Sequence, residues 1–423
     1  MNNALLKSFQ TLQVVYQDRA FSTIALNKTL NGCFGKEKPL VTKVVYGVLD
    51  NDVKLQYVIG KFVKKLPKGD VLLYLKIGAY CLMELSMPVY AVVNDVAELS
   101  KLSDDKRTVG FVNATLKSMA SADVKNFADY PQDFAERLSA QYSYPLWSVK
   151  KIIKDYGKEE AERIISAPPN HATTIRIACS KEDFLAKHKE ACELLPTVFD
   201  DVFYLQGRLP KVDETFTPQS LSSVAIAKIC ANAAKENFLD CCSAPGGKAV
   251  CVAGIRQDLS VVACDVHSHR VELIDSYASR MGVKVQTHCQ DMTVFCQEWQ
   301  GKFDTVLCDV PCSGFGVLDS RPDIKLFRQN EDISSLMKLQ QAILQNCSNY
   351  VSVGGSLVYS TCTLFRNENE QNIRKFLQNN PNFTLGNINL PQLPNVHGKP
   401  HYQFLPHVDG MQGFFVCVLT RIQ

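Results

Sequence analysis

The chain has 423 residues, of which 46% are hydrophobic and 21% are charged, a composition that excludes disordered, collagen-like and low-complexity proteins. A single hydrophobic core rarely serves so long a chain, so we expect two or three domains. The net charge of +3 indicates no particular partner. Lys and Arg outnumber Asp and Glu over residues 1–128, which fits either a polyanion contact or solvated helix faces.

The chain shows no sign of a membrane or secretory segment. Its start, MNNALLKSFQ, lacks the apolar run of a signal peptide, and the most apolar region is interrupted by Lys76, Glu84 and Pro88. We therefore expect a soluble, cytoplasmic protein without a membrane partner. The 16 cysteines are scattered through apolar segments, and no two form a Cys-x-x-Cys pair. This pattern predicts reduced, mostly buried cysteines and no metal site.

Apolar residues recur at helical spacing over residues 1–128, as in ALLKSFQTLQVVYQ and VTKVVYGVLDNDVKLQYVIGKFV. Short polar breaks such as GKEKP separate these segments, so the spacing predicts an all-helical bundle. In residues 129–147 the pattern loosens and prolines bracket one short helix, which is typical of a linker.

Two further regions follow. Residues 149–209 contain the helical segments KKIIKDYGKEEAERIISA and KEDFLAKHKEACELL with the strands TTIRIAC and VFYLQG, which predicts a small α+β module. With the linker it makes a middle region, 129–211. From residue 212 to 423, strands alternate with helices: FLDCCSA, VVACDV, VKVQTHC, DTVLCDV, SLVYSTC and FFVCVLT. Alternation predicts a doubly wound parallel α/β sheet, whose ligands lie at the carboxyl ends of its strands.

The first of these strands runs into a glycine turn within DCCSAPGGKAVCVAG. A Pro-Gly-Gly turn before a helix presents free backbone N–H groups and lets a ligand approach closely. The turn is not G-x-G-x-x-G, so it does not match a dinucleotide fingerprint, and an ordinary strand-to-helix turn has the same composition. As cofactor-binding candidates we take Cys242, Ser243, Ala244, Pro245, Gly246, Gly247 and Lys248.

Acids at three later strand ends strengthen this interpretation. Asp265, about 20 residues past the turn, is placed to accept hydrogen bonds from ribose hydroxyls, and Asp291 from an adenine amino group. Asp309 ends the next strand. One such acid is usually a helix cap, but three in step are less easily explained that way. The short turn suits an adenosyl ligand without pyrophosphate, such as S-adenosylmethionine.

Two strand-like segments end by presenting a cysteine, Cys312 in DVPCSGFG and Cys362 in YSTCTLF. A thiolate that adds to carbon 6 of a cytosine makes carbon 5 nucleophilic, and a second group is then useful for moving protons. Two cysteines and the Asp309 carboxylate at adjacent strand ends supply these parts. On this argument alone, either cysteine could be the nucleophile.

The segments DCCSAPGGK, DVPCSGFGVLDSRPDIK, YSTCTLFRNENE and LPHVDGMQGFF resemble motifs of the NOL1/NOP2/Sun group of RNA cytosine-5 methyltransferases. The helical segment that ends in GFVNATLKSM is similar to the NusB-like RNA-binding domain of bacterial members that act on small-subunit ribosomal RNA. The resemblance implies three parts: a NusB-like bundle over 1–128, the middle region, and a Rossmann-like class I methyltransferase over 212–423.

The resemblance also implies roles for individual residues. Cys362 would be the nucleophile, Cys312 would assist product release, and Asp309 would face the target base as well as the cofactor. The glycine turn with Asp265 and Asp291 would hold S-adenosylmethionine. The partner would be small-subunit (16S) ribosomal RNA, and we expect a monomer.

The chain departs from the family pattern at Ala178, Ser220 and Ala249, none of which is a proposed catalytic group. Two alternatives stay open: a transfer RNA cytosine-5 methyltransferase, and a non-catalytic RNA-binding assembly factor with the same fold. Phosphate contacts are the possible role of Arg321, Lys325 and Arg328, with solvated charges as the equal alternative.

Overall fold

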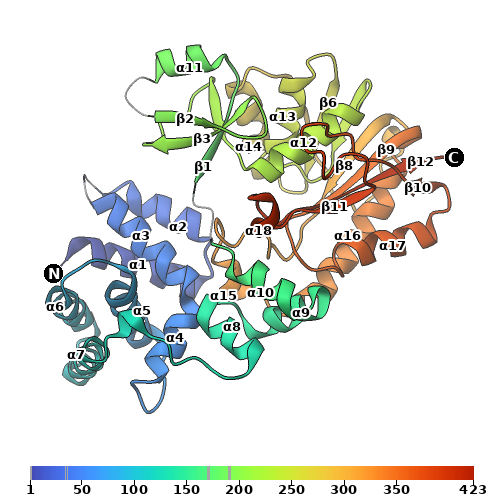
Figure 1. The fold of residues 1–423 in the computed structure, drawn as a ribbon. Helices are drawn as coiled ribbons and strands as arrows, with labels where there is room; N and C mark the ends of the chain where they lie inside the picture. The colour runs from blue at the N-terminus through green and yellow to red at the C-terminus, as the bar shows by residue number, and fades with distance from the viewer. Residues whose placement is uncertain (1, 34, 36, 169–171, 189–191) are drawn as a thin grey trace. The chain divides into compact units, whose positions relative to one another are not determined.

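The structure is a computed structural model that describes residues 2–33, 35, 37–168, 172–188 and 192–423. The chain divides into two compact units (Figure 1): Met1–Ala167 with Leu318–Gln329, and Pro168–Val317 with Asn330–Gln423. Among the described helices, none is both long and apolar enough to cross a membrane. Each unit has its own hydrophobic core.

The first unit is all-helical, as the apolar spacing predicts, because each helix buries one apolar face in a shared core. Leu12, Val48 and Leu116, for example, are fully buried in that core although they come from three different helices. Its helices are α1 Asn3–Asp18, α2 Ser22–Leu30, α3 Glu37–Asp50, α4 Asp52–Gly60, α5 Gly69–Glu84, α6 Val89–Ser100, α7 Lys106–Ser121, α8 Phe134–Tyr142, α9 Leu146–Tyr156 and α10 Lys158–Ser166, with 3₁₀ turns at Lys101–Ser103 and Val124–Asn126.

Lys76 interrupts the most apolar segment of the sequence, and the structure shows how its charge is accommodated. Its ammonium forms an ion pair with Asp52 of α4, and both side chains are more than nine-tenths buried. The Tyr16 hydroxyl donates to the same carboxylate at 2.5 Å, and the Lys76 ammonium lies 4.5 Å from the centre of the Tyr16 ring. A buried charge is tolerated only with such partners, so this lysine is structural.

The segment Leu318–Gln329 follows the Cys312 loop in the sequence but belongs to the helical unit. Its helix α15, Ile324–Phe327, packs Leu326 and Phe327 against the helical core. Two buried polar contacts fix it: the Ser22 hydroxyl donates to Asp323 at 2.5 Å, and Lys325 pairs with Asp50 at 2.7 Å. Lys325 is only 7% exposed. Neither the phosphate role nor the solvated role considered for Lys325 is therefore correct.

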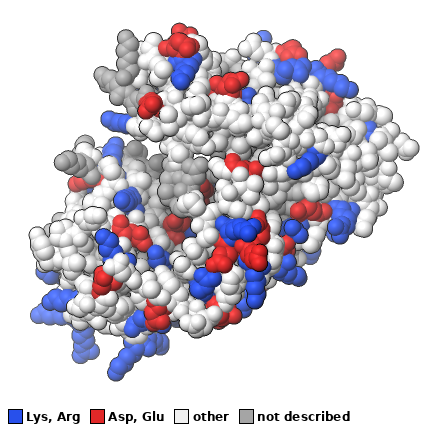
Figure 2. Space-filling model, in the orientation of Figure 1, with Lys and Arg blue, Asp and Glu red and all other residues white. Residues whose placement is uncertain are grey.

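The lysines of residues 61–68 lie in the loop between α4 and α5. Lys61 pairs with Asp129 at 2.9 Å, and Lys64, Lys65 and Lys68 are exposed. On the face shown in Figure 2, basic side chains gather over this end of the helical unit, near α7. The modest positive balance of residues 1–128 is thus displayed at the surface.

The second unit begins with a small antiparallel sheet in the order β2-β3-β1-β4. Its strands are β1 Thr173–Ile177, β2 Cys192–Pro196, β3 Val202–Gly207 and β4 Phe216–Pro218, with helix α11 Lys181–Lys187. The helix predicted for KEDFLAKHKEACELL ends at Lys187, and its last residues form β2, because Leu194 is buried opposite Leu205 of β3. Residues 189–191 of that segment lie outside the described residues.

The large sheet of the second unit has the strand order β10-β12-β9-β8-β5-β6-β7, with β11 paired to β12. Strands β7, β6, β5, β8 and β9 are parallel, as predicted, whereas β12 runs antiparallel to β9. The strands are β5 Asn237–Asp240, β6 Ser260–Asp265, β7 Gln286–Cys289, β8 Phe303–Asp309, β9 Val351–Thr361, β10 Phe383–Leu385, β11 His401–Gln403 and β12 Phe415–Arg421; the helices are α12 Leu221–Ala233, α13 Gly247–Ile255, α14 Ser268–Arg280, α16 Asp332–Ser348, α17 Glu370–Asn379 and α18 Pro406–Asp409, with a 3₁₀ turn at Gln297–Trp299.

The two units divide the predicted middle region, 129–211, between them. Helices α8, α9 and α10 join the helical unit, whereas the small sheet joins the second unit. The segment KKIIKDYGKEEAERIISA forms two helices rather than one, because Gly157 has a φ of +83° and ends α9. The helical unit therefore extends to Ala167 and also takes in α15.

The Lys325–Asp50 pair should contribute measurably to the stability of the helical unit. Asp50→Ala should lower the free energy of unfolding by roughly 2 kcal/mol, because it leaves a buried ammonium without its carboxylate. The double variant Asp50→Ala/Lys325→Met should recover part of that loss, since the unpaired charge is gone. Urea unfolding measures both. The exposed Lys64→Ala is the control, and equal losses in the single and double variants would contradict the assignment.

Candidate active site

The polar residues singled out from the sequence lie at one edge of the large sheet. Asp240, Asp265, Asp309 and Thr361 are the last residues of β5, β6, β8 and β9. These four strands are parallel neighbours, so their carboxyl ends meet. The sequence predicted three acids, Asp265, Asp291 and Asp309, and the two cysteine loops at strand ends, and the topology is consistent with this because Asp291 follows β7, the parallel neighbour of β6.

The glycine turn connects β5 to α13 and leaves polar atoms facing inward. Gly246 has a φ of +101°, and its N–H donates to the Ser243 carbonyl at 2.7 Å. The carboxylate oxygens of Asp240 and the hydroxyl of Ser243 are buried and have no hydrogen-bond partner among the described residues. Buried polar atoms in native proteins normally find partners. Their state here fits a turn that is completed by a polar ligand.

Asp265 and Asp291, two of the acids predicted to bind the cofactor, differ in their surroundings. Asp265 is 4% exposed and pairs with Arg270 of α14 at 3.1 Å, while Arg270 also donates to the Ala244 carbonyl of the glycine turn at 2.9 Å. Arg270 was not among the predicted site residues. Asp291 is exposed and follows β7; its Oδ1 accepts from the N–H and hydroxyl of Thr293, which lowers its pKa. Its adenine-binding role stays a prediction.

Lys248 and Asp309 form the central ion pair of the site. The Lys248 ammonium lies 2.6 Å from Asp309 Oδ2, and the Ser360 hydroxyl donates to Asp309 Oδ1 at 2.6 Å. Burial alone would lower the pKa of Lys248, but the attraction of Asp309 outweighs it and the pKa is raised. Lys248 thus stays charged, and it lies 5.3 Å from the ring centre of Phe414. Asp309 keeps an exposed fraction of 24%.

A second carboxyl group, that of Asp240, lies near this ion pair, and its pKa is raised. Burial and then the negative charge of Asp309 raise the pKa of Asp240 to about 7. The two carboxyl groups thus lie in different surroundings, since Asp309 is paired with a lysine and Asp240 is fully buried. A carboxyl group whose pKa is raised as far as that of Asp240 is typical of functional sites.

The two cysteines predicted from the sequence are in direct contact. The sulfur atoms of Cys312 and Cys362 are 3.1 Å apart, and the Cys362 N–H donates to Cys312 Sγ at 3.3 Å. The hydrogen bond to Cys362, followed by burial, raises the pKa of Cys312 well above its usual value. Either sulfur can be the donor in this contact, and the raised pKa of Cys312 makes its thiolate form unfavourable.

The closing segment of the chain packs directly on the Cys312 loop. Gly316 donates to the Cys362 carbonyl at 2.9 Å and accepts from Gly413 at 2.8 Å. A Cβ added at Gly316 would lie only 1.7 Å from the Gly413 carbonyl oxygen, so no other residue fits there. Three of the quoted motifs, those of the Cys312 loop, the Cys362 loop and the closing segment, are thus joined by backbone contacts.

The positions where the chain departs from the family pattern have local explanations. Ser220 caps α12 by accepting from the Ser223 N–H, and Ala249 is fully buried in α13. Ala178 lies just past β1, where its N–H donates to the Thr215 carbonyl. The neighbouring Gln219 reaches the glycine turn, because its amide donates to the Gly247 carbonyl at 2.9 Å.

Several residues that hold the site were not predicted, although they stand in quoted motifs. Glu368 and Asn369, in YSTCTLFRNENE, are fully buried and contact the residues that flank the cysteines. The signal was present, since charged and amide side chains beside a catalytic motif need partners when buried. Local sequence does not say which partners they find.

Comparisons with known proteins agree on the family. The family model described as 16S rRNA methyltransferase RsmB/F matches residues 227–420, and that of the NusB family matches residues 2–121. A "Probable ribosomal RNA small subunit methyltransferase B" of Bacillus subtilis (strain 168) is 31% identical over 98% of both chains. The chain belongs to the RsmB/F family of 16S rRNA methyltransferases. A "Ribosomal RNA small subunit methyltransferase B" of Citrobacter koseri is 29% identical over 97% of this chain and 96% of its own.

Solved structures share the fold. The crystal structure of PH0851 has a TM-score of 0.79 at 20% identity and covers 99% of this chain and 98% of its own. NSun6 from Pyrococcus horikoshii with SFG has a TM-score of 0.57 at 20% identity, covering 65% of this chain and 97% of its own. The fold class predicted from the sequence is confirmed: a NusB-like helical part is followed by an α/β methyltransferase.

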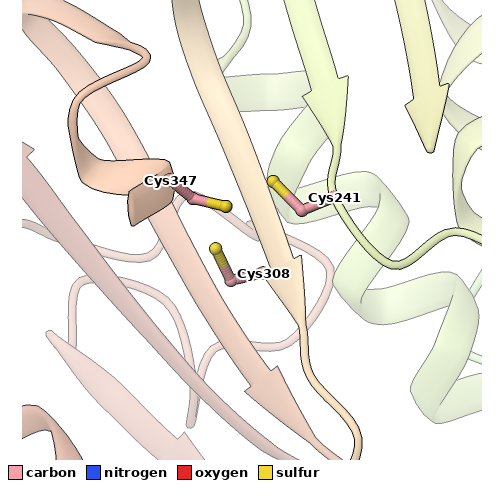
Figure 3. A group of neighbouring side chains, drawn as sticks. All are labelled: Cys241, Cys308 and Cys347. Carbon is pink, nitrogen blue, oxygen red and sulfur yellow. The ribbon is translucent and has the colours of Figure 1, made fainter. Parts of the chain in front are cut away.

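A second cysteine group lies in the core beneath the site. Figure 3 shows Cys241 after β5, Cys308 on β8 and Cys347 on α16, whose sulfur atoms face one another and all lie within 4.8 Å. Burial raises the pKa of Cys241 and of Cys347, while hydrogen bonds from these two lower that of Cys308. Among the described residues the group offers three ligands, whereas a structural zinc site needs four. Its neighbours are apolar core residues, so we interpret it as packing.

This interpretation of the three cysteines is testable. Purified protein should contain no stoichiometric zinc or copper, and treatment with a chelator should leave its melting temperature unchanged. Cys347→Ala should lower the free energy of unfolding by only about 1 kcal/mol, because a small buried side chain is shortened. A metal equivalent that disappears in Cys347→Ala would overturn the interpretation.

The raised pKa of Asp240 predicts a pH dependence of stability. The folded-state pKa of about 7 lies above the unfolded value, so the protonated group stabilises the fold at low pH and this contribution is lost as the pH rises toward 7. Asp240→Asn cannot ionise. Relative to wild type it should therefore gain about 2–3 kcal/mol between pH 5 and pH 8 in urea unfolding. The exposed Asp258→Asn should show no such gain, and a constant difference for Asp240→Asn would contradict the assignment.

Proposed function

We propose that this chain transfers a methyl group from S-adenosylmethionine to carbon 5 of a cytosine in small-subunit ribosomal RNA, through a covalent adduct between Cys362 and carbon 6. The observation that carries the proposal is the pair of cysteines in contact at 3.1 Å, at the strand ends that also hold the Lys248–Asp309 ion pair. Two positioned thiols beside a carboxylate match what this chemistry requires.

The surroundings of the pair bear on which cysteine attacks carbon 6. The contact with Cys362, followed by burial, raises the pKa of Cys312 well above its usual value, which disfavours Cys312 as the attacking thiolate. The argument from the sequence left both cysteines open, and the resemblance to the family favoured Cys362. The assignment of Cys362 rests on that resemblance, and the raised pKa of Cys312 agrees with it.

Asp309 and Lys248 are suited to hold the base. Asp309 Oδ1 and Oδ2 already accept from Ser360 and Lys248, which fixes the orientation of the carboxylate. A carboxylate so oriented accepts from the exocyclic amino group of a cytosine, and a nearby ammonium offsets negative charge that develops on the ring. Lys248 therefore serves the base as well as the glycine turn.

The cofactor site is built from the glycine turn and the adjacent acids. The unpartnered oxygens of Asp240 and Ser243 fit a polar ligand, and the buried Asp265 fits ribose hydroxyls. When bound, S-adenosylmethionine supplies an electrophilic methyl group. The residues from Cys242 to Lys248, together with Asp265, Asp291 and Asp309, would hold it with that group facing the base.

Cys312 then assists release of the product. Once carbon 5 carries the methyl group, a solvent water takes its proton, the electron pair of that C–H bond re-forms the double bond between carbons 5 and 6, and the bond between carbon 6 and sulfur breaks with its electron pair returning to Cys362. A thiol that donates to the departing sulfur stabilises the thiolate as it forms. The contact between Cys312 and Cys362 places a donor there.

The substrate class rests on the helical unit and the relatives. The NusB match and the names of the relatives favour small-subunit ribosomal RNA over transfer RNA. With such a substrate, the location that we propose for the reaction is the cytoplasm. A purely RNA-binding role would leave the paired thiols and the protonated Asp240 without a use.

The test is transfer of label from tritiated S-adenosylmethionine to unmodified small-subunit RNA, with the product nucleosides separated. Label in 5-methylcytidine supports the proposal. Label in another nucleoside, or transfer only to transfer RNA, would replace the substrate assignment, and no transfer with cofactor still bound would favour the non-catalytic alternative.

Variants of the two cysteines should separate attack from release. Cys362→Ala should abolish transfer, by a factor of about 10³ or more, because the covalent route is lost. Cys312→Ala should instead accumulate a protein–RNA adduct that resists denaturation, visible as a band of reduced mobility on denaturing gels. Cys179→Ala, half-buried and outside the site, is the control. Full activity of Cys362→Ala would end the assignment.

A further inference from the structure

A fully buried carboxylate lies between the two loops that carry the cysteines. Glu368 stands in the segment after β9, two residues before α17, and has no exposed surface. Its Oε1 accepts from the Ser313 N–H at 2.9 Å, and its Oε2 accepts from the Ser313 hydroxyl at 2.5 Å. Both donors of the residue that follows Cys312 therefore end on one carboxylate.

The chain of contacts continues to the other cysteine loop. The Ser313 hydroxyl lies 2.6 Å from the hydroxyl of Thr363, the residue that follows Cys362. Ser313 and Thr363 are both fully buried. Glu368, Ser313 and Thr363 thus link the two loops at the positions next to the two sulfur atoms.

Two amide side chains hold the remaining flanks of the loops. Asn369 accepts from the Thr361 hydroxyl at 2.6 Å and donates to the Thr363 carbonyl at 3.0 Å, so it brackets Cys362. Gln340 of α16 donates to Glu368 Oε1 and to the Pro311 carbonyl, each at 2.9 Å. The residues on both sides of each cysteine are thus held by Glu368 or by the two amide side chains next to it.

We propose that Glu368 is a positioning residue that holds Cys312 and Cys362 at contact distance, and that this separation is what lets one thiol serve the other during catalysis; its catalytic part rests on the proposed function. A carboxylate suits the task, because Ser313 offers two donors in different directions and only a group with two acceptor oxygens receives both. Burial strengthens these hydrogen bonds and makes their loss costly.

The first experiment measures the separation without RNA. Oxidised glutathione converts two thiols to one disulfide and is itself reduced to two glutathione thiols, so the equilibrium constant for the Cys312–Cys362 disulfide reports the effective concentration of one thiol at the other. Alkylation and mass spectrometry of the peptides quantify it. Glu368→Gln should lower this effective concentration about tenfold or more. Glu370→Gln, two residues away and facing Arg366, should leave it unchanged.

A second pair of variants keeps the test valid if Glu368→Gln does not fold. Thr363→Val keeps the shape but removes the hydroxyl that meets Ser313, and should also lower the effective concentration. Thr363→Ser keeps the hydroxyl and should restore it. An unchanged value in both folded Glu368→Gln and Thr363→Val would overturn the proposal, because the thiols would then be held by other groups.

The catalytic consequence is read separately. Glu368→Gln and Thr363→Val should lower kcat about tenfold or more while the KM for S-adenosylmethionine stays within twofold, and Thr363→Ser should retain activity. If the effective concentration falls but wild type methylates no RNA, the positioning role stands and the proposed function fails. If the effective concentration falls and kcat does not, the separation is irrelevant to the reaction and the catalytic part of the proposal is wrong.

Discussion

The edge of the large sheet that carries the candidate active site depends on the parallel hydrogen-bonded pairing of β8 with β9. In its register Asp309 lies opposite Ser360, so the Cys312 loop and the Cys362 loop leave the sheet side by side. The hydrogen bond between Asp309 and Ser360, the contact of the two sulfur atoms and the Glu368 links all require this register. A shift by one residue would turn Asp309 to the opposite face and separate every one of these groups.

The electrostatics of the edge follow from how few charges it contains. Lys248 is a largely buried cation that pairs with Asp309, so Asp240 lies near the negative charge of Asp309 without an ion-pair partner of its own. Desolvation then drives Asp240 toward its protonated form, because a second buried anion without its own cation is expensive. The same arrangement explains why the lysine of the glycine turn does not simply project into solvent.

The sequence allowed us to predict the features whose positions follow from the order of strands and helices along the chain. It did not show which distant residues contact one another in the fold. Strand ends, the glycine turn and the cysteines could be found, because parallel strands must bring their carboxyl ends together. The strand at Cys192–Pro196 could not be predicted, because its pairing with β3 overrides a helical pattern. The burial of Lys325 could not be predicted either, because nothing in the neighbouring sequence shows that Lys325 pairs with Asp50, 275 residues away. The roles of Glu368 and Asn369 were missed for the same reason: burial turned motif residues into links between distant loops.

The cysteines themselves show how environment separates chemistry from packing. Cys241, Cys308 and Cys347 are enclosed by apolar core side chains, whereas Cys312 and Cys362 are half-buried at a strand edge and flanked by hydroxyl residues. The sulfur atoms lie close together in both groups, so proximity does not distinguish one group from the other. The difference lies in the residues beside them. Ser313 and Thr363 are small enough to be buried and polar enough to be held, so each fixes the backbone of its cysteine without blocking the sulfur. We therefore attribute the difference between the two cysteine groups to the side chains that follow Cys312 and Cys362 as much as to the cysteines themselves.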